Sequence, residues 1–245
     1  MRESRNLTDG IILRLVDYGE NDLIVGILTS SHGKLSVFAP SARKSQKRFG
    51  AGLDLFTYIQ IDMAPPRNIQ SHLWRLHRIE LLDPHLGLRK DLSSLATASY
   101  LAECLWNFVG EGDHEIRIFE WWKETLKKLS HSSSAFSDIR LEVEMLTLCG
   151  YAPRWKNCIE CGRSPCGPSL FFSYDHGGVI CGSCKKIGAG TWLDTAWVSK
   201  LETGEDVPES GRSTVRRAMN GFISHTLGKE PKSQKFREEV LGESA

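Results

Sequence analysis

Two Cys-x2-Cys pairs constrain the fold of this chain more than any other feature of its sequence. Cys158 and Cys161 form the first pair, Cys181 and Cys184 form the second, and 19 residues (162–180) separate the pairs. Two pairs at this spacing can complete the tetrahedral shell of four sulfur atoms that Zn²⁺ accepts. Four thiolates leave no open position for water, so the pattern predicts one structural zinc ion per chain rather than a catalytic metal.

Other interpretations of the cysteines stay open at this point. Four unrelated buried thiols would also fit, and a single Cys-x2-Cys pair can act as a redox centre. A redox centre needs only one pair, placed after a strand of a βαβ unit, and neither pair has that position. Cys166 and His176 lie between the pairs and could replace a ligand. Gly162 and Gly182 follow the pairs closely, where we expect the backbone to turn tightly.

Residues 1–82 contain five short segments that are rich in β-branched and aromatic residues and bounded by Gly, Pro, Asn or Ser. These segments are DGIILRLVDYG, DLIVGILTSS, GKLSVFAP, LDLFTYIQIDMAPP and HLWRLHRIELL. Short strands with turn signals at a spacing of roughly ten residues are typical of a small β-barrel or sandwich. An OB-like barrel is the natural candidate at this size.

The remaining chain divides into helical and loop-rich parts. Residues 83–150 contain three stretches with apolar residues at helical spacing, and residues 191–245 return to short helices, so we expect these ranges to form one helical domain. Residues 151–190 hold seven glycines, three prolines and five of the seven cysteines, and they predict a loop-rich zinc-finger insert. The fold class expected is therefore a multidomain α+β chain with an N-terminal OB-fold β-barrel, a helical bundle and an inserted four-cysteine zinc finger.

The chain carries 31 basic and 30 acidic residues, so its net charge excludes no class of partner. The charge is nevertheless uneven, because no acidic residue occurs between Asp22 and Asp54. Residues 41–50, SARKSQKRFG, carry four cations in this gap and are called the basic loop below: Arg43, Lys44, Lys47 and Arg48. The loop is either a solvated turn or a site for phosphates, and we expect all four side chains to be exposed. An OB-like barrel favours the phosphate site, since such barrels bind oligonucleotides on one face and on the adjoining loops.

Three further residues complete the candidate nucleic-acid site. Lys34 lies in the same acid-free gap, and Trp74 and Arg75 lie on the last predicted strand. An aromatic ring among cations could stack a base, although a half-buried strand tryptophan is the competing interpretation of Trp74.

The sequence gives little support for a membrane protein or an enzyme. No stretch longer than about a dozen residues lacks a charged residue, and the first ten residues lack the apolar core of a secretory signal. We therefore expect a cytoplasmic chain with reduced thiols and no contact with membranes. The sequence contains no HExxH, no GxxxxGK[ST] and no GxSxG motif, and no H-x-E partner of a zinc deaminase.

Taken in order, these features resemble the RecO family of bacterial recombination mediator proteins. The resemblance rests on ILRLVDYGENDLIVGILTSSHGKLSVFA, ARKSQKRFGAGLDLFTYIQI, LEVEMLTLCGYAPRWKNCIECG, FFSYDHGGVICGSC and HTLGKEPKSQKF, which extend over nearly the whole chain. It implies an OB-fold, a helical domain and an inserted zinc finger with Cys158, Cys161, Cys181 and Cys184 as ligands. It also implies that the basic loop contacts DNA.

The resemblance further implies a non-enzymatic role in DNA repair. This role comprises binding of single- and double-stranded DNA, annealing of complementary strands, and loading of RecA recombinase onto strands covered by single-strand-binding protein, with RecR as partner. The chain departs from the family at Pro40-Ser41, where a lysine–glycine pair is usual, so one phosphate contact is missing and the loop is stiffer. A zinc-assisted nuclease or deaminase, and a scaffold that binds no DNA, remain the alternatives.

Overall fold

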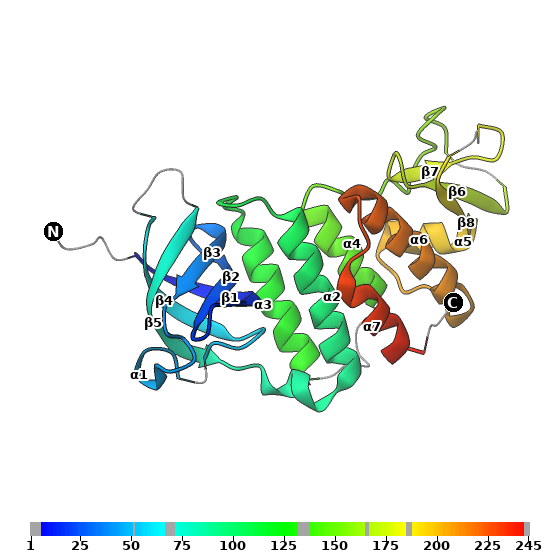
Figure 1. The fold of residues 1–245 in the computed structure, drawn as a ribbon. Coiled ribbons are helices and arrows are strands. Elements are labelled where there is room, and N and C mark those ends of the chain that lie inside the picture. The colour runs from blue at the N-terminus through cyan, green and yellow to red at the C-terminus, as the bar shows by residue number, and fades with distance from the viewer. Residues whose placement is uncertain are drawn as a thin grey trace. The chain divides into compact units, whose positions relative to one another are not determined.

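The computed structural model describes residues 6–50, 52–66, 72–131, 138–164, 167–184 and 188–242. The chain divides into two compact units, Met1–Ser133 and Ser134–Ala245. The first unit contains five strands, a short 3-10 helix and three helices (Figure 1): β1 (Asn6–Tyr18), β2 (Asp22–Thr29), β3 (Gly33–Ala39), α1 (Gln46–Phe49), β4 (Tyr58–Ala64), β5 (Leu73–Asp83), η1 (Leu86–Lys90), α2 (Leu92–Phe108) and α3 (Ile116–His131).

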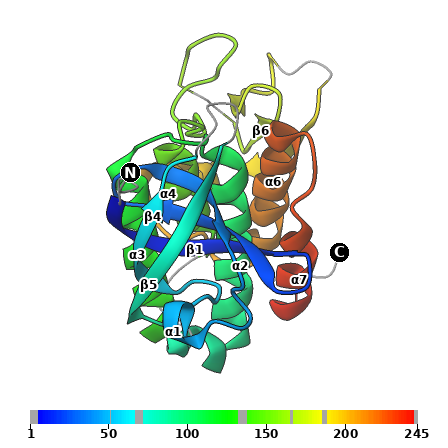
Figure 2. The ribbon, with the colours of Figure 1, turned by 60° about the vertical axis from the view of Figure 1, so that its left-hand side comes forward.

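The five strands close into a barrel in the order β1-β2-β3-β5-β4, and β1 completes the ring by pairing with β4. All neighbouring strands are antiparallel except β3 and β5, which are parallel. This is the topology of an OB-fold, so the predicted fold class of the N-terminal region is confirmed. The short helix α1 lies beside β5 (Figure 2) and contributes Phe49 to the barrel core.

Alternation along the strands decides which side chains fill the barrel. In β3, Leu35, Val37 and Ala39 are buried, whereas Ser36 and Phe38 between them are only partly buried. The other barrel-core residues follow the same rule and are Ile12, Val25, Ile27, Ile59, Ile61, Met63, Leu76 and Ile79. Their burial on one face explains why the five apolar segments were recognisable as strands in the sequence.

Helix α2 is held against the outer surface of the barrel by Trp106. The Arg14 guanidinium lies 5.5 Å from the centroid of this indole ring, and the Lys34 ammonium lies 4.8 Å from it. Gly26 on β2 leaves the space that the ring occupies, because a Cβ atom built on Gly26 would meet Trp106 Cζ3 at 2.4 Å. The two cations restrict the ring, so it cannot easily move to admit a larger residue.

We therefore expect Gly26→Ala to lower the free energy of unfolding by about 1–3 kcal/mol, through overpacking against Trp106. Urea denaturation of the wild-type and variant proteins measures this difference. In a Trp106→Leu background the same substitution should cost clearly less, because the smaller side chain admits the methyl group. An equal cost in both backgrounds would show that the ring is not the cause.

The second unit contains helices and a small three-stranded sheet: α4 (Asp138–Leu148), β6 (Ser169–Ser173), β7 (Gly178–Ile180), β8 (Gly190–Asp194), α5 (Thr195–Thr203), α6 (Glu209–Leu227) and α7 (Lys232–Val240). The sheet is antiparallel in the order β7-β6-β8. Short helices were expected from residue 191 onward, but residues 190–194 form β8. The pairing of β8 with β6 outweighs the local pattern there.

Buried charges connect the helices of the second unit. Arg237 on α7 is fully buried, pairs with Glu142 on α4 and donates to Asn220 Oδ1 on α6 at 2.7 Å. Burial raises the pKa of Glu142, and the adjacent Arg237 guanidinium opposes that shift. Arg216 on α6 pairs with Asp138 on α4 at 2.5 Å. A buried charge needs such a partner, so these contacts specify how the three helices pack.

The three helices expected in residues 83–150 are present as α2, α3 and α4. The division of the chain at residues 82, 150 and 190 into barrel, helical domain and insert stays a prediction. Among the helices of the described residues, none has both the length and the apolar character needed to cross a lipid bilayer.

Candidate metal centre and nucleic-acid interface

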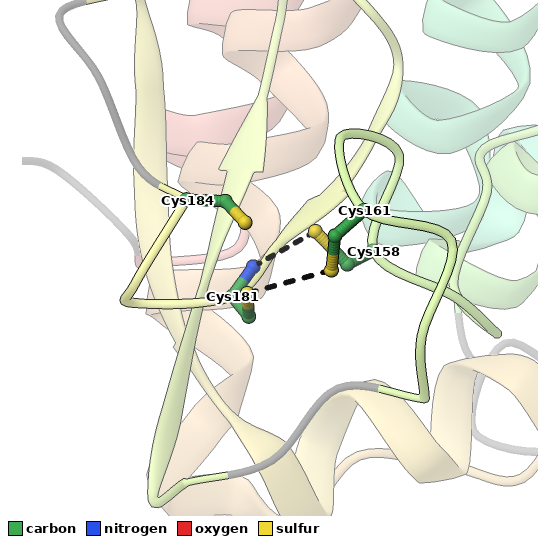
Figure 3. A group of neighbouring side chains, drawn as sticks. All are labelled: Cys158, Cys161, Cys181 and Cys184. Carbon is green, nitrogen blue, oxygen red and sulfur yellow. Dashed lines mark hydrogen bonds between the residues drawn. The ribbon is translucent and has the colours of Figure 1, made fainter.

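The four cysteines of the two pairs converge on one point in the second unit (Figure 3). Their Sγ atoms all lie within 4.8 Å of one another, and Cys161 Sγ is 4.0 Å from Cys181 Sγ. A tetrahedral zinc shell with Zn–S bonds of about 2.3 Å requires S···S distances of about 3.8 Å. The donor set and its spacing therefore fit a metal ion, and these four side chains could hold one.

Each pair is positioned by its own tight turn. The Gly162 N–H donates to Cys158 O at 2.8 Å, and the Cys184 N–H donates to Cys181 O at 3.0 Å. Gly162 has a φ of 71°, in the left-handed region that favours glycine, so the tight turn expected there is confirmed. Residues 182–184 also form a turn, so the expectation is confirmed for the second pair too, although Gly182 makes this turn without a positive φ.

The β6–β7 sheet brings the two turns together. The Ile159 N–H in the first turn donates to Val179 O on β7 at 3.0 Å, and the second turn follows directly after β7. The Cys181 N–H donates to Cys158 Sγ at 3.4 Å (Figure 3), which joins the turns through the cluster itself. Cys158 and Cys181 are buried beside Phe171.

The electrostatics of the cluster favour a bound cation. Hydrogen bonds lower the pKa of Cys181 to about 6, and the largest contribution comes from the side chain of Ser183. Hydrogen bonds from Arg163 lower the pKa of Cys161. Side-chain hydrogen bonds to Cys181 and then to Cys161 raise the pKa of Cys184 to about 12, and repulsion from those two thiolates adds to the shift. A divalent cation removes this repulsion and allows all four thiols to ionise. Sequence reasoning missed Arg163, for which the signal was a cation two residues after Cys161.

His176 and Cys166 are the two residues that the sequence offers as replacements for a metal ligand. His176 is exposed in the turn between β6 and β7, and it is outside the ligand group that the described residues form. Cys166 lies outside the described residues.

The basic loop leaves the barrel at the end of β3, and the turn between β1 and β2 holds it in place. The Ser41 N–H donates to Asp22 Oδ1 at 2.7 Å, and the Arg43 N–H donates to Asn21 O at 3.1 Å. Ser41 has a φ of 53°, a conformation that favours glycine, at the position where the resemblance implies one. The backbone of the loop is therefore fixed before any ligand binds.

The four cations of the loop are not equivalent. Lys44 and Lys47 are exposed, and Arg43 is exposed while it contacts Asp17. Arg48 is half-buried, donates from its guanidinium to Pro40 O at 2.7 Å and to Ser45 Oγ at 2.9 Å, and covers the ring of Phe49. The expectation of four exposed side chains is therefore wrong for Arg48, because its guanidinium bonds to the loop itself.

The remaining three predicted residues lie on β3 and β5 of the barrel. Lys34 is buried and donates to Trp106 O at 2.7 Å, and burial lowers the pKa of its ammonium group. Trp74 is half-buried against the barrel core, with its ring 5.0 Å from that of His32 in an edge-to-face contact. Arg75 is exposed. The structure thus leaves Arg75 accessible and places Lys34 and Trp74 in internal contacts.

Fold and sites together define an OB-fold protein with a four-cysteine cluster of the metal-binding kind. The family model described as Recombination protein O N terminal matches residues 1–85, and the model described as Recombination protein O C terminal matches residues 89–235. The chain belongs to the RecO family of DNA repair proteins.

Individual relatives support this assignment over most of the chain. The DNA repair protein RecO of Myxococcus xanthus is 30% identical over 239 residues, which cover 95% of this chain and 96% of the relative. The protein of the same name from an Anaeromyxobacter species is 31% identical over 254 residues, which cover 98% of each chain. That of Syntrophotalea carbinolica is 33% identical over 198 residues, which cover 80% of this chain and 74% of the relative.

Proposed function

We propose that this DNA repair protein is a non-enzymatic recombination mediator of the cytoplasm that associates with the nucleoid. It binds single- and double-stranded DNA, anneals complementary strands, and assists the loading of RecA onto strands covered by single-strand-binding protein, together with RecR. Membership of the RecO family supports this role. The work is done by binding energy, since neutralised phosphates allow two complementary strands to approach each other.

The observation that carries the proposal is the basic loop. Three accessible cations, Arg43, Lys44 and Lys47, extend from a backbone that is already bonded to the β1–β2 turn, so binding need not order the loop. Arg75 adds a fourth accessible cation on β5. Arg48 supports the loop from within. Lys34 and Trp74 would have to leave their present contacts to reach DNA, so they are weaker members of the proposed set.

Zinc is the metal we propose for the four-cysteine cluster, with one structural ion per chain. Four thiolates form a soft, closed tetrahedral shell, which zinc accepts and which leaves no position for a substrate or water. The same closed shell opposes the alternative of a zinc-assisted nuclease or deaminase. An absence of DNA turnover by the zinc-loaded protein is the result that would separate the mediator from such an enzyme.

A salt titration of labelled single-stranded DNA tests the proposal. If about four cations contact phosphates, log K should fall with log salt concentration at a slope of about −2.8, or about −0.7 for each contact. A strand-annealing assay on the same protein should show faster pairing of complementary oligonucleotides than in its absence. A protein that neither binds DNA at low salt nor accelerates annealing would be a scaffold instead.

A further inference from the structure

An exposed aromatic residue lies next to the basic loop on the barrel surface. Tyr18, the last residue of β1, is 55% exposed. Its ring contacts that of Phe38 on β3 edge to face, with the ring centroids 5.7 Å apart and an interplanar angle of 83°. The side chain of Phe38 is partly buried, so the two rings form a small apolar surface that we call the Tyr18–Phe38 platform.

The register of the barrel explains why these rings point outward. Phe38 lies between Val37 and Ala39, which are both buried in the barrel core, so alternation places Phe38 on the opposite face of β3. Phe38 pairs with Ile24 on β2, close to the turn that follows Tyr18. Tyr18 is not among the described residues of the barrel core, so packing of that core does not explain an aromatic residue at this position.

Two cations, Arg75 and Arg43, lie beside the platform, and the carboxylate of Asp17 lies between Arg43 and Tyr18 in the contact chain. Arg75 pairs with Phe38 across β3 and β5, and its guanidinium carbon lies 6.0 Å from the ring centroid of Phe38. The residue before Tyr18, Asp17, contacts Arg43 of the basic loop. The turn after Tyr18 accepts the backbone hydrogen bonds that hold that loop, at Asn21 and Asp22. The β1–β2 hairpin therefore carries Tyr18 and also holds the basic loop.

We propose that the Tyr18–Phe38 platform stacks one unpaired base of single-stranded DNA, while Arg75 and the basic loop bind the neighbouring phosphates. This inference rests on the proposed function and names the residue that distinguishes single strands from duplexes. Aromatic rings beside a cationic track bind single strands in this way because every base has a π-face. In a duplex both faces of an internal base are already stacked, so the platform adds nothing to duplex binding.

The structure favours Tyr18 over Trp74 as the stacking residue. Trp74 packs against the barrel core and against the edge of His32, so its ring is already in contact with other groups. Tyr18 has most of its surface available and is joined through its own hairpin to the basic loop.

Binding of a thymidine homopolymer, and of a duplex of the same length, by single-residue variants tests this inference. Tyr18→Ala should weaken binding of the homopolymer roughly tenfold, since stacking one base contributes on that order. The salt slope should not change, because no phosphate contact is lost. Duplex binding should stay at the wild-type level, and Tyr18→Trp should retain tight binding of the homopolymer.

Two controls make the result decisive. Leu7→Ala removes another exposed apolar side chain of β1, which is 67% exposed, and should leave homopolymer binding unchanged. An oligomer of abasic sites should bind the wild type and Tyr18→Ala equally, because it offers phosphates without bases. An equal loss on duplex or abasic DNA, or wild-type affinity of Tyr18→Ala for the homopolymer, would overturn the platform while leaving the proposed function in place. A wild-type protein that does not bind DNA at all would overturn both.

Discussion

Cys158→Ser or Cys181→Ser is expected to release the metal and to unfold residues 151–190 while the barrel stays folded. Both side chains are buried in the cluster, with exposed fractions of 1% and 6%. The apolar residues that support the cluster are few, and structural zinc contributes on the order of 10–16 kcal/mol in isolated zinc-finger peptides. A small loop-rich segment cannot replace that contribution from its own core.

Elemental analysis and hydrogen exchange would measure this effect in the full chain. The wild type should contain about one zinc per chain, and the variants none, with loss of amide protection limited to the second unit. Cys149→Ser is the matched control, since Cys149 is half-buried and lies outside the cluster, and this variant should keep its zinc. A wild type without metal, or a Cys158→Ser variant that retains a full zinc content, would disprove the zinc assignment.

The combined substitution of Arg43, Lys44 and Lys47 by alanine should abolish strand annealing at physiological salt. Each lost phosphate contact should flatten the slope of log K against log salt by about 0.7, so the slope should approach about −0.7 from about −2.8. The same relation predicts an affinity for single-stranded DNA about two orders of magnitude lower at roughly 0.1 M salt. Arg48 is kept, because its bonds to Pro40 O and Ser45 Oγ hold the loop.

The control for this experiment removes the same number of positive charges elsewhere in the first unit. Arg117, Lys127 and Lys128 are exposed on α3, and their replacement by alanine should change the slope little. Both triple variants should unfold at the wild-type urea concentration, because the affected side chains are exposed. Equal effects of the two triple variants on DNA binding would indicate a response to net charge and would contradict a specific role of the basic loop.

Local patterns in the sequence were sufficient to predict the barrel strands, helices α2, α3 and α4, and the members of the cysteine cluster, but they did not predict the sheet of β6, β7 and β8. The five barrel strands follow from alternating apolar residues between turn residues, and α2, α3 and α4 follow from helical periodicity. The cysteine cluster follows from the pairing of two short motifs, because each motif brings two thiols together within one turn. Within each strand, helix or Cys-x2-Cys pair the signal depends on residues only a few positions apart, and the two cysteine pairs are 19 residues apart.

Which cations are accessible could be decided only by the tertiary structure. Lys34 and Arg48 are as basic in sequence as Lys44 and Lys47, yet Lys34 donates to Trp106 O and Arg48 to Pro40 O. Trp106 is 72 residues from Lys34, so no local pattern reveals that contact.

The Tyr18–Phe38 platform is likewise a product of barrel closure. Tyr18, Phe38 and Arg75 belong to three different strands, and the parallel pairing of β3 with β5 sets Arg75 beside Phe38. Short-range periodicity and spacing are enough to predict the barrel strands, helices α2, α3 and α4, and the four thiols that assemble. Which charges and rings face the solvent together depends instead on strand register and burial, and these are set by contacts between residues far apart in the chain.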